Sequence, residues 1–314
     1  MLYLSKQTLE SLDISTDAML NKLEQLIREQ GQGNVYSAPK AAISTADSRY
    51  LMATLSATDN PPYMAVKALV VNQKNSEQGL DAINATITLL NSQTGLPVAV
   101  MDGNWITAIR TAAASAVAAR RMANPDSSVL TFIGCGVQAF SHLQLFSEMF
   151  PLREVRLLGR GLKNRQALIA KVESMGLTAV DCESAEQAVT GADLVVSSIP
   201  LTTKVEPFID AAWIAEGAFV CSVDLGIPWM PESLSIFDRI LVDDLQQEAA
   251  MPQPLVNPEL VNGDVNGLLC GDVSGRESPK ERTAFMFRAV PLGDLALATL
   301  AYESAKAQNV GTEI

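Results

Sequence analysis

The chain has 314 residues, 48% of them hydrophobic, and this length predicts about two domains with large cores. A formal net charge of -12 argues against general binding to nucleic acid or to an anionic membrane. Four cysteines without paired spacing and a single histidine, His142, argue against a disulfide framework, a metal site or a Ser-His-Asp triad within one chain. Without a signal-peptide layout or a membrane-length apolar run, we expect a cytoplasmic protein.

The N-terminal part of the chain predicts an α+β domain. Residues 8–28 contain apolar positions whose later members have helical spacing, with Thr16 or Asp17 as the cap and Gly31 near the end. Short apolar and β-branched runs follow, and the last two predict a hairpin. The expected strands are residues 41–44, 50–55, 64–71, 85–90 and 96–101, with a loop at 59–62.

An alanine-rich stretch after Asp102 and Gly103 predicts a helix over residues 105–123. Arg110 and Thr111 lie near its N-terminal end. A guanidinium beside the free N–H groups of a helix start is suited to binding a carboxylate. The alternative is that Arg110 forms a surface ion pair.

Residues 129–133 predict a buried parallel strand, which is followed at once by a G-x-G-x-x-A turn and a helix over residues 140–150. Gly134 permits the sharp turn, Gly136 lets phosphate oxygens approach the backbone, and Ala139 lets the helix pack close to the strand. Free N–H groups at the helix start then face the anion. This context predicts dinucleotide binding, and the alternative is a glycine-rich turn that only joins strand to helix.

The second strand of this domain, residues 154–158, ends at Gly159 and Arg160. Enzymes that prefer NAD usually carry an acidic residue here, which holds the ribose 2′-hydroxyl. Arg160, with Lys163 and Arg165 close behind, suits a 2′-phosphate instead. We therefore expect NADP(H) to be the preferred cofactor, with NAD(H) left open. The alternatives for Arg160 are stacking on adenine and simple exposure to solvent.

The remaining chain predicts further strands and a final helix that returns to the first domain. The expected helices are residues 185–190 and 283–307, and the second of these is broken at Pro291. The expected strands are residues 194–199, 218–223 and 239–242, of which the third is expected to be the last strand of the chain. Residues 208–214 are expected to form a turn or helix, and residues 252–280 are rich in loops.

Asp224 lies at the carboxyl end of the expected strand 218–223. Ligands of open α/β sheets bind at that edge, so Asp224 is a candidate proton handler. The alternative is that it caps a helical segment around residues 231–233.

These motifs resemble the ornithine cyclodeaminase/mu-crystallin family over nearly the whole chain. The most specific parts are residues 101–104, 106–108 and 110–113, together with the turn from Gly134 to Ala139. The family comprises ornithine cyclodeaminases, ketimine reductases, some alanine dehydrogenases and Δ1-pyrroline-2-carboxylate reductases. The resemblance implies an α/β chain that forms a homodimer. It would have a Rossmann NAD(P)-binding domain, residues 119–287, and an α+β substrate-binding and dimerisation domain, residues 1–118 and 288–314.

Family roles transfer to the positions that match. Arg110 corresponds to the arginine that grips the substrate carboxylate, Lys67 to the active-site lysine, and Asp224 to the aspartate near the substrate nitrogen. Arg160 corresponds to the arginine of NADP-binding members. The implied cofactor contacts are Thr111, Gly134, Cys135, Gly136, Val137, Gln138, Arg160, Ser198 and Asp224.

Two positions depart from the family pattern. Lys40 stands where the family often has an arginine, and a lysine keeps the charge but loses the planar two-pronged grip. Met52 stands where cyclodeaminases carry a glutamate that helps to hold ornithine. A methionine cannot bind an ammonium group, so an imine substrate without a second amine is favoured. The implied substrate-binding set is Lys40, Met52, Lys67 and Arg110, and the implied catalytic set is Lys67 and Asp224.

The resemblance and the departures imply NAD(P)H-dependent reduction of a small cyclic 2-imino acid. We expect Δ1-pyrroline-2-carboxylate, reduced to L-proline, as the substrate and proline or hydroxyproline metabolism as the setting. Asp224 would stabilise the protonated imine or relay its proton. Within the family, the alternatives are an ornithine cyclodeaminase with tightly held NAD and an alanine dehydrogenase. Outside catalysis, the alternative is a crystallin-like protein that binds NADPH and a small ligand.

Overall fold

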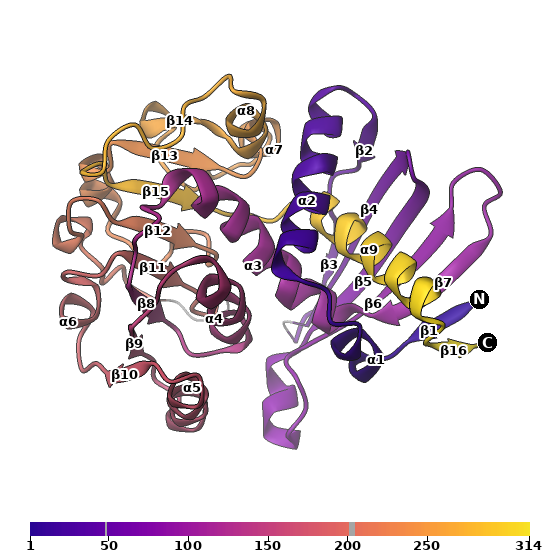
Figure 1. Cartoon of the computed structure of the whole chain (residues 1–314), viewed down its shortest axis with the longest axis horizontal. Helices are drawn as coiled ribbons and strands as arrows, with labels where there is room; N and C mark the ends of the chain where they lie inside the picture. Colours follow the sequence, from indigo (N-terminus) through magenta and orange to yellow (C-terminus); the bar gives the residue numbers. More distant parts are fainter. Residues whose placement is uncertain (48, 201–204) are drawn as a thin grey trace. The chain divides into compact units, whose positions relative to one another are not determined.

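A computed structural model of the chain describes residues 1–47, 49–200 and 205–314 (Figure 1). The chain forms two compact units, residues 1–110 with 290–314 and residues 111–289. Helix α3 (Gly103–Met122) runs through the first boundary, which lies eight residues before the boundary expected from the sequence, after residue 118. None of the helices in the described ranges combines the length and the apolar character that a membrane crossing requires.

The first unit is built on one mixed sheet with the strand order β16-β1-β7-β6-β5-β4-β2 and with β3 paired to β4. Strands β4 to β7 form successive antiparallel pairs, which confirms the predicted hairpin, and β1 pairs with β7 in parallel. The strands are β1 (Leu2–Leu4), β2 (Val35–Ser37), β3 (Ala41–Ser44), β4 (Tyr50–Asp59), β5 (Pro62–Val71), β6 (Ile83–Asn91), β7 (Pro97–Asp102) and β16 (Thr312–Glu313).

Within the described residues of the first unit, one face of this sheet is covered by helices and the other is not. Helix α9 (Leu292–Gln308) packs on β4, β5 and β6, and α2 (Thr16–Gly31) packs beside α9 (Figure 1). Because side chains alternate along a strand, β5 buries Lys67 and exposes Val66. We call the covered side the inner face and the uncovered side the outer face. The unit also contains α1 (Lys6–Ser11) and a 3-10 turn, η1 (Gln73–Gln78).

The second unit contains a parallel sheet in the order β10-β9-β8-β11-β12-β15-β13-β14. If β8 to β12 are numbered 1 to 5 along the chain, their order in the sheet is 3-2-1-4-5. This strand order, with helices in the connections, confirms the predicted Rossmann arrangement. The strands are β8 (Val129–Ile133), β9 (Glu154–Leu158), β10 (Thr178–Asp181), β11 (Leu194–Ser197), β12 (Phe219–Ser222), β13 (Arg239–Val242), β14 (Val261–Asp264) and β15 (Thr283–Met286). The helices are α4 (Val137–Met149), α5 (Leu162–Ser174), α6 (Ala185–Val189), α7 (Leu245–Ala249) and α8 (Val265–Cys270), with 3-10 turns η2 (Ala211–Trp213), η3 (Pro231–Ile236) and η4 (Pro258–Leu260).

The predicted N-terminal helix is confirmed as α2, but its predicted cap is wrong by one or two residues. The earlier Leu9 lies in a separate helix, α1, and Asp13, with a left-handed φ of 49°, lies between the two helices. Ser15, rather than Thr16 or Asp17, caps α2, since its side chain accepts a hydrogen bond from the Ala18 N–H at 3.3 Å.

The C-terminal prediction is also wrong in part. The segment expected to begin the last helix is strand β15, which lies between β12 and β13 in the sheet. Consequently β13 is not the last strand, and the helix α9 begins only after Pro291. A short apolar run inside a parallel sheet is buried on both sides, so its pattern does not distinguish strand from helix.

Candidate active site

A buried cluster of charged side chains lies on the inner face of the first unit. Lys67 is 1% exposed and lies opposite Thr54 in the β4–β5 pair. Its Nζ is 2.8 Å from Oδ1 and 2.7 Å from Oδ2 of Asp294, at the start of α9. Arg110 Nε donates to Oδ1 at 3.1 Å, and Thr54 Oγ1 donates to Oδ2 at 3.2 Å. One carboxylate therefore accepts hydrogen bonds from three side chains on three different elements.

Two cations and one anion leave this cluster with one positive charge at neutral pH. Burial and the charge of Arg110 lower the pKa of Lys67 to about 8, while Asp294 raises it in part, so Lys67 remains an ammonium. Burial by itself would raise the pKa of Asp294, but Arg110 and Lys67 outweigh it and hold that pKa below its usual value. A buried site with one excess positive charge is suited to a ligand with one carboxylate.

The structure places the other two predicted substrate residues near Lys67. Met52 pairs with Leu69 in the β4–β5 ladder, two positions from the Lys67 pair, so its side chain lies on the same inner face. Lys40 directly precedes β3, and its charge contributes to the lowered pKa of Lys67. Arg110 is 6% exposed, so its interpretation as a surface ion pair is wrong.

Asp294 lies in none of the motifs that predict functional residues. Its signal was an isolated acidic residue in the otherwise apolar run from Leu292 to Ala298. A carboxylate in the buried first turn of a helix requires a partner, and nothing in the local sequence names Lys67 or Arg110 as that partner.

In the second unit, the glycine-rich turn has the geometry that a phosphate requires. Gly134 has φ of +102°, and a Cβ added there would lie 2.7 Å from the Ser198 carbonyl oxygen. Gly136 precedes α4, which begins at Val137 rather than at residue 140 and has no side-chain cap. A Cβ on Gly136 would meet nothing within 4 Å, so the helix start is open to an anion.

Two predicted cofactor residues carry buried polar atoms that lack a hydrogen-bond partner in the described part of the chain. They are Oε1 of Gln138, in the first turn of α4, and Oγ of Ser198, directly after β11. Buried polar atoms are normally satisfied, so both are suited to contact a polar ligand. Together with the open helix start, they fit the phosphates and ribose of a dinucleotide. Thr111 lies in α3, where its carbonyl oxygen accepts a hydrogen bond from Ser115 Oγ at 3.1 Å.

The end of β9 packs closely against the glycine-rich turn. A Cβ on Gly159 would lie 2.9 Å from Sγ of Cys135 in the glycine-rich turn. Burial raises the pKa of Cys135 to about 11, so its thiol stays protonated and is not a nucleophile at neutral pH. Arg165 is engaged within the unit, where it contacts Asp181 and donates to the Gly159 carbonyl oxygen. Arg160 is exposed.

Asp224 follows β12 and is 1% exposed. Its Oδ1 accepts from Ser197 Oγ at 2.9 Å and Ser222 Oγ at 2.6 Å, and its Oδ2 accepts from the Ile199 N–H at 3.0 Å. Burial raises its pKa, against the effect of these hydrogen bonds. The helix-cap interpretation is wrong, because Met230 precedes η3 and provides no side-chain cap.

The sequence profile of the ornithine cyclodeaminase/mu-crystallin family matches residues 2–309. This chain belongs to that family. Its similarity to the ketimine reductase mu-crystallin of Rattus norvegicus is 32% identity over 245 residues, covering 77% of this chain and 76% of the relative.

Two solved structures of this family have the same fold along the whole chain. One is the Δ1-pyrroline-2-carboxylate reductase of Thermococcus litoralis in complex with NADH and L-proline, with a TM-score of 0.90, 26% identity and 100% of both chains covered. The other is an archaeal alanine dehydrogenase dimer with bound NAD, with a TM-score of 0.88, 29% identity, and 100% of this chain and 98% of that chain covered. Ornithine cyclodeaminase/mu-crystallin family members are oxidoreductases that act on CH–NH groups with nicotinamide cofactors, and the predicted family and fold class are confirmed.

Proposed function

We propose that this chain catalyses the NAD(P)H-dependent reduction of a cyclic 2-imino acid, and that the substrate is Δ1-pyrroline-2-carboxylate, which is reduced to L-proline. The observation that carries the proposal is the buried cluster of Lys67, Arg110 and Asp294, whose single excess charge matches a monocarboxylate. Similarity to the reductase solved with NADH and L-proline supports the choice of ring.

In this proposal, Lys67 and Arg110 bind the substrate carboxylate. An ammonium carries three N–H donors, and Asp294 is the one acceptor that Lys67 has in the described part of the chain. A second carboxylate, from the substrate, would accept from the remaining donors. Lys40, which lies close enough to affect the charge of Lys67, would add to the attraction. These contacts would fix the ring and hold the carbon next to the carboxylate in one position.

The chemical step adds a hydride to the imine carbon and a proton to the imine nitrogen. The cofactor, when bound, supplies the hydride. A protonated imine accepts hydride more readily, so the protein must stabilise that cation. We assign this role to Asp224, either as a carboxylate facing the iminium or as a relay for its proton. Its three hydrogen bonds hold the carboxyl group in one orientation.

The side chains around the cluster disfavour ornithine as a substrate. Met52 offers no acceptor to a second ammonium, and Asp294 is already engaged by two cations. Asp47 lies on an exposed loop, where it contacts Arg49 and Thr45. Asp59 is exposed at the opposite end of β4 from Met52. An ammonium without an acceptor in a closed site carries a large desolvation cost.

We also propose that NADPH is preferred over NADH. Gly159 carries no carboxylate to hold the ribose hydroxyl, and a Cβ there would crowd Sγ of Cys135 at 2.9 Å. Arg160 is exposed one residue later, where a guanidinium suits a phosphate.

We also propose that the protein forms a homodimer in which the outer faces of the two first units are in contact. This face exposes large apolar side chains that none of the described elements of the first unit covers. The similar alanine dehydrogenase is a dimer, which supports a second copy as the covering partner. The residues concerned are Tyr36, Ile43, Leu51, Leu55, Met64, Val66 and Val70.

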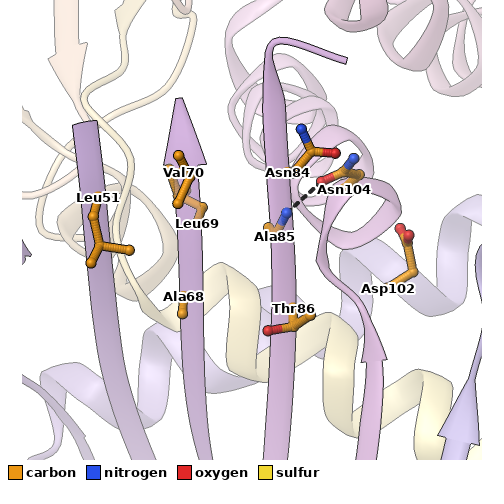
Figure 2. Close-up of a pocket in the computed structure, with 9 residues that line it drawn as sticks. All are labelled: Leu51, Ala68, Leu69, Val70, Asn84, Ala85, Thr86, Asp102 and Asn104. Atoms are coloured by element: carbon orange, nitrogen blue, oxygen red, sulfur yellow. Dashed lines mark hydrogen bonds between the residues drawn. The ribbon is translucent and has the colours of Figure 1, made fainter. Parts of the chain in front are cut away.

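The outer face also contains a shallow hollow of about 350 Å³, which we do not assign to the substrate (Figure 2). Ala68 and Val70 of β5 line it, whereas Lys67 points to the inner face. At its side, Asn104 Oδ1 accepts a hydrogen bond from the Ala85 N–H at 2.8 Å. The hollow belongs to the surface that we propose to be covered in the dimer.

The proposed reaction is tested by following oxidation of NADPH and NADH by the purified protein. The panel contains Δ1-pyrroline-2-carboxylate, its six-membered-ring homologue, and pyruvate with ammonia, which tests alanine dehydrogenase, the activity of the similar archaeal protein. Turnover with a cyclic imino acid and formation of L-proline would support the proposal. Turnover with pyruvate and ammonia alone would overturn it in favour of alanine dehydrogenase. Nucleotide binding without any turnover would favour a binding protein.

A further inference from the structure

We propose that Asp294 is a positioning residue that keeps Lys67 in its ammonium form and orients Lys67 and Arg110 for the substrate carboxylate. This inference rests on the proposed function for the identity of the ligand, but not for the charge state of Lys67. It adds to the site a residue of the last helix, 227 positions from Lys67 in the sequence.

The position of Asp294 is fixed by its backbone as well as by its partners. It lies in the first turn of α9, which has no side-chain cap, and the positive end of the helix dipole stabilises a carboxylate there. The carbonyl oxygen of Pro291, at the same helix start, accepts a hydrogen bond from Ser56 Oγ of β4 at 3.4 Å. The helix start is therefore tied to the sheet that carries Lys67.

The same turn also sets the path of Arg110. A Cβ added to Gly293 would lie 3.1 Å from Cδ of Arg110, so the glycine lets the arginine side chain pass directly over the helix start. From there, Arg110 Nε donates to Asp294 Oδ1, the oxygen that also lies 2.8 Å from Lys67 Nζ. Both cations thus contact the same oxygen and are held close together, which suits them to bind a single carboxylate of the substrate.

The charges around Lys67 explain why Asp294 decides its protonation. Three charged groups act on Lys67: the cations Arg110 and Lys40, and the anion Asp294. Its other neighbours across the sheet are Thr54 and the apolar Ile87. Without Asp294, burial and both cations would all favour the neutral amine. A neutral Lys67 would carry no charge to attract a carboxylate.

A purely structural ion pair would behave differently. Its loss would lower thermal stability, but it would not change the pH at which substrate binding weakens. The decisive variant is Asp294→Asn, which keeps the shape and removes the charge. The matched control is Thr54→Val, which removes one hydrogen bond from the same carboxylate and leaves all charges in place. Asp294→Glu is the rescue variant, because it keeps the charge.

Two readouts test the inference on the full chain saturated with NADPH. The first is the titration of Lys67, followed by NMR of protein labelled with ¹³C at the lysine ε carbon and assigned through a Lys67→Arg variant. The second is KM for Δ1-pyrroline-2-carboxylate against pH, with kcat measured in parallel. For Asp294→Asn we expect the Lys67 midpoint to fall by more than about one pH unit. We expect KM at pH 8 to rise roughly 10–150-fold. Acidification to pH 6 should recover much of this loss, whereas kcat should change far less.

The possible results distinguish a wrong role for Asp294 from a wrong proposed reaction. An unshifted Lys67 midpoint in Asp294→Asn, or an equal shift in Thr54→Val, would overturn the role of Asp294 even in an active reductase. A shifted midpoint in a protein that reduces no imino acid would support the charge role and overturn the proposed reaction. Should Asp294→Asn fail to fold, the wild-type titration decides: a Lys67 that is neutral at pH 7 despite Asp294 would also overturn the inference.

Discussion

Gly134 and Ser198 pack so closely that a Cβ on Gly134 would lie 2.7 Å from the Ser198 carbonyl oxygen. Gly134 also has φ of +102°, which L side chains rarely adopt. We therefore expect Gly134→Ala to destabilise the second unit by about 1–3 kcal/mol and to weaken NADPH binding at the same time. Thermal unfolding without ligand, followed by nucleotide titration, measures both effects.

Gly136→Ala is the matched control for this prediction. Gly136 has an ordinary backbone, and a Cβ there would meet no protein atom within 4 Å. We expect its unfolding temperature without ligand to match that of the wild type, while affinity for NADPH falls because the methyl group occupies the space of the phosphate. A Gly136→Ala protein with unchanged NADPH affinity would show that the phosphate does not bind at this turn.

Arg160 provides the test of cofactor preference. We expect Arg160→Asp to lower kcat/KM for NADPH roughly 10–150-fold, because a charge-assisted contact to the 2′-phosphate is lost, and to change the value for NADH much less. Lys171→Asp, the same charge change near the end of α5, should leave the ratio between the two cofactors unchanged. Equal losses with both cofactors in Arg160→Asp would remove the 2′-phosphate role.

We expect the folded chain to lose stability in mild acid because of the buried His142. Burial lowers its pKa from 6.5 to about 4 in the folded chain, where Nδ1 contacts the Gln138 carbonyl oxygen at 2.7 Å and Nε2 contacts Ser115 Oγ at 2.8 Å. The unfolded chain binds the proton more tightly, so this contribution is complete above about pH 6.5 and is lost as the pH falls toward 4. Relative to His142→Gln, the wild type should lose about 2 kcal/mol between pH 7.5 and 5. Urea unfolding at both pH values measures this difference, and parallel losses in the two proteins would contradict the assignment.

Local sequence patterns were sufficient for the strand-turn-helix at Gly134 and for the hairpin of β6 and β7, because their signals lie within a few residues of one another. They failed at β15, where Thr283 to Met286 form a fully buried strand between two others. The sequence of those four residues does not indicate that a strand pairs on each side of them, and a helix begins only a few residues later.

The candidate site shows the same limit. Lys67, Arg110 and Asp224 could be named from motifs. Asp294 could not, because its partners lie 184 and 227 positions away in the sequence. The helix-cap interpretation of Asp224 failed for a related reason: its hydrogen bonds include Ser197 and Ile199, which belong to the neighbouring strand end. Tertiary contacts, rather than local propensity, decide the partners of buried charges.

If the outer face of the first unit is the dimer interface, charged side chains introduced there should dissociate the dimer. Leu55 and Val66 pair directly across β4 and β5 and are 48% and 37% exposed. We expect the double variant Leu55→Asp, Val66→Asp to be monomeric in light scattering after size exclusion, and still to bind NADPH. Leu245→Asp in α7, where the leucine is similarly exposed, should keep the mass of the wild type. A monomeric wild type, or a double variant that stays dimeric, would exclude this face as the interface.

Position 52 provides a test of whether the protein is a reductase or a cyclodeaminase. The Met52 side chain lies on the inner face with Lys67, and we propose that it takes the place of the glutamate that helps cyclodeaminases of the family to hold ornithine. We expect the wild type, incubated with L-ornithine and NAD, to release no ammonia and to form no proline, while it reduces Δ1-pyrroline-2-carboxylate. Met52→Leu should retain imino-acid reduction, because it keeps an apolar side chain of similar size. Met52→Glu should raise KM for the imino acid, because a new carboxylate on the inner face competes for Lys67 and repels the substrate carboxylate. Stoichiometric release of ammonia and proline by the wild type would overturn the reductase assignment and would mean that another group accepts the second ammonium.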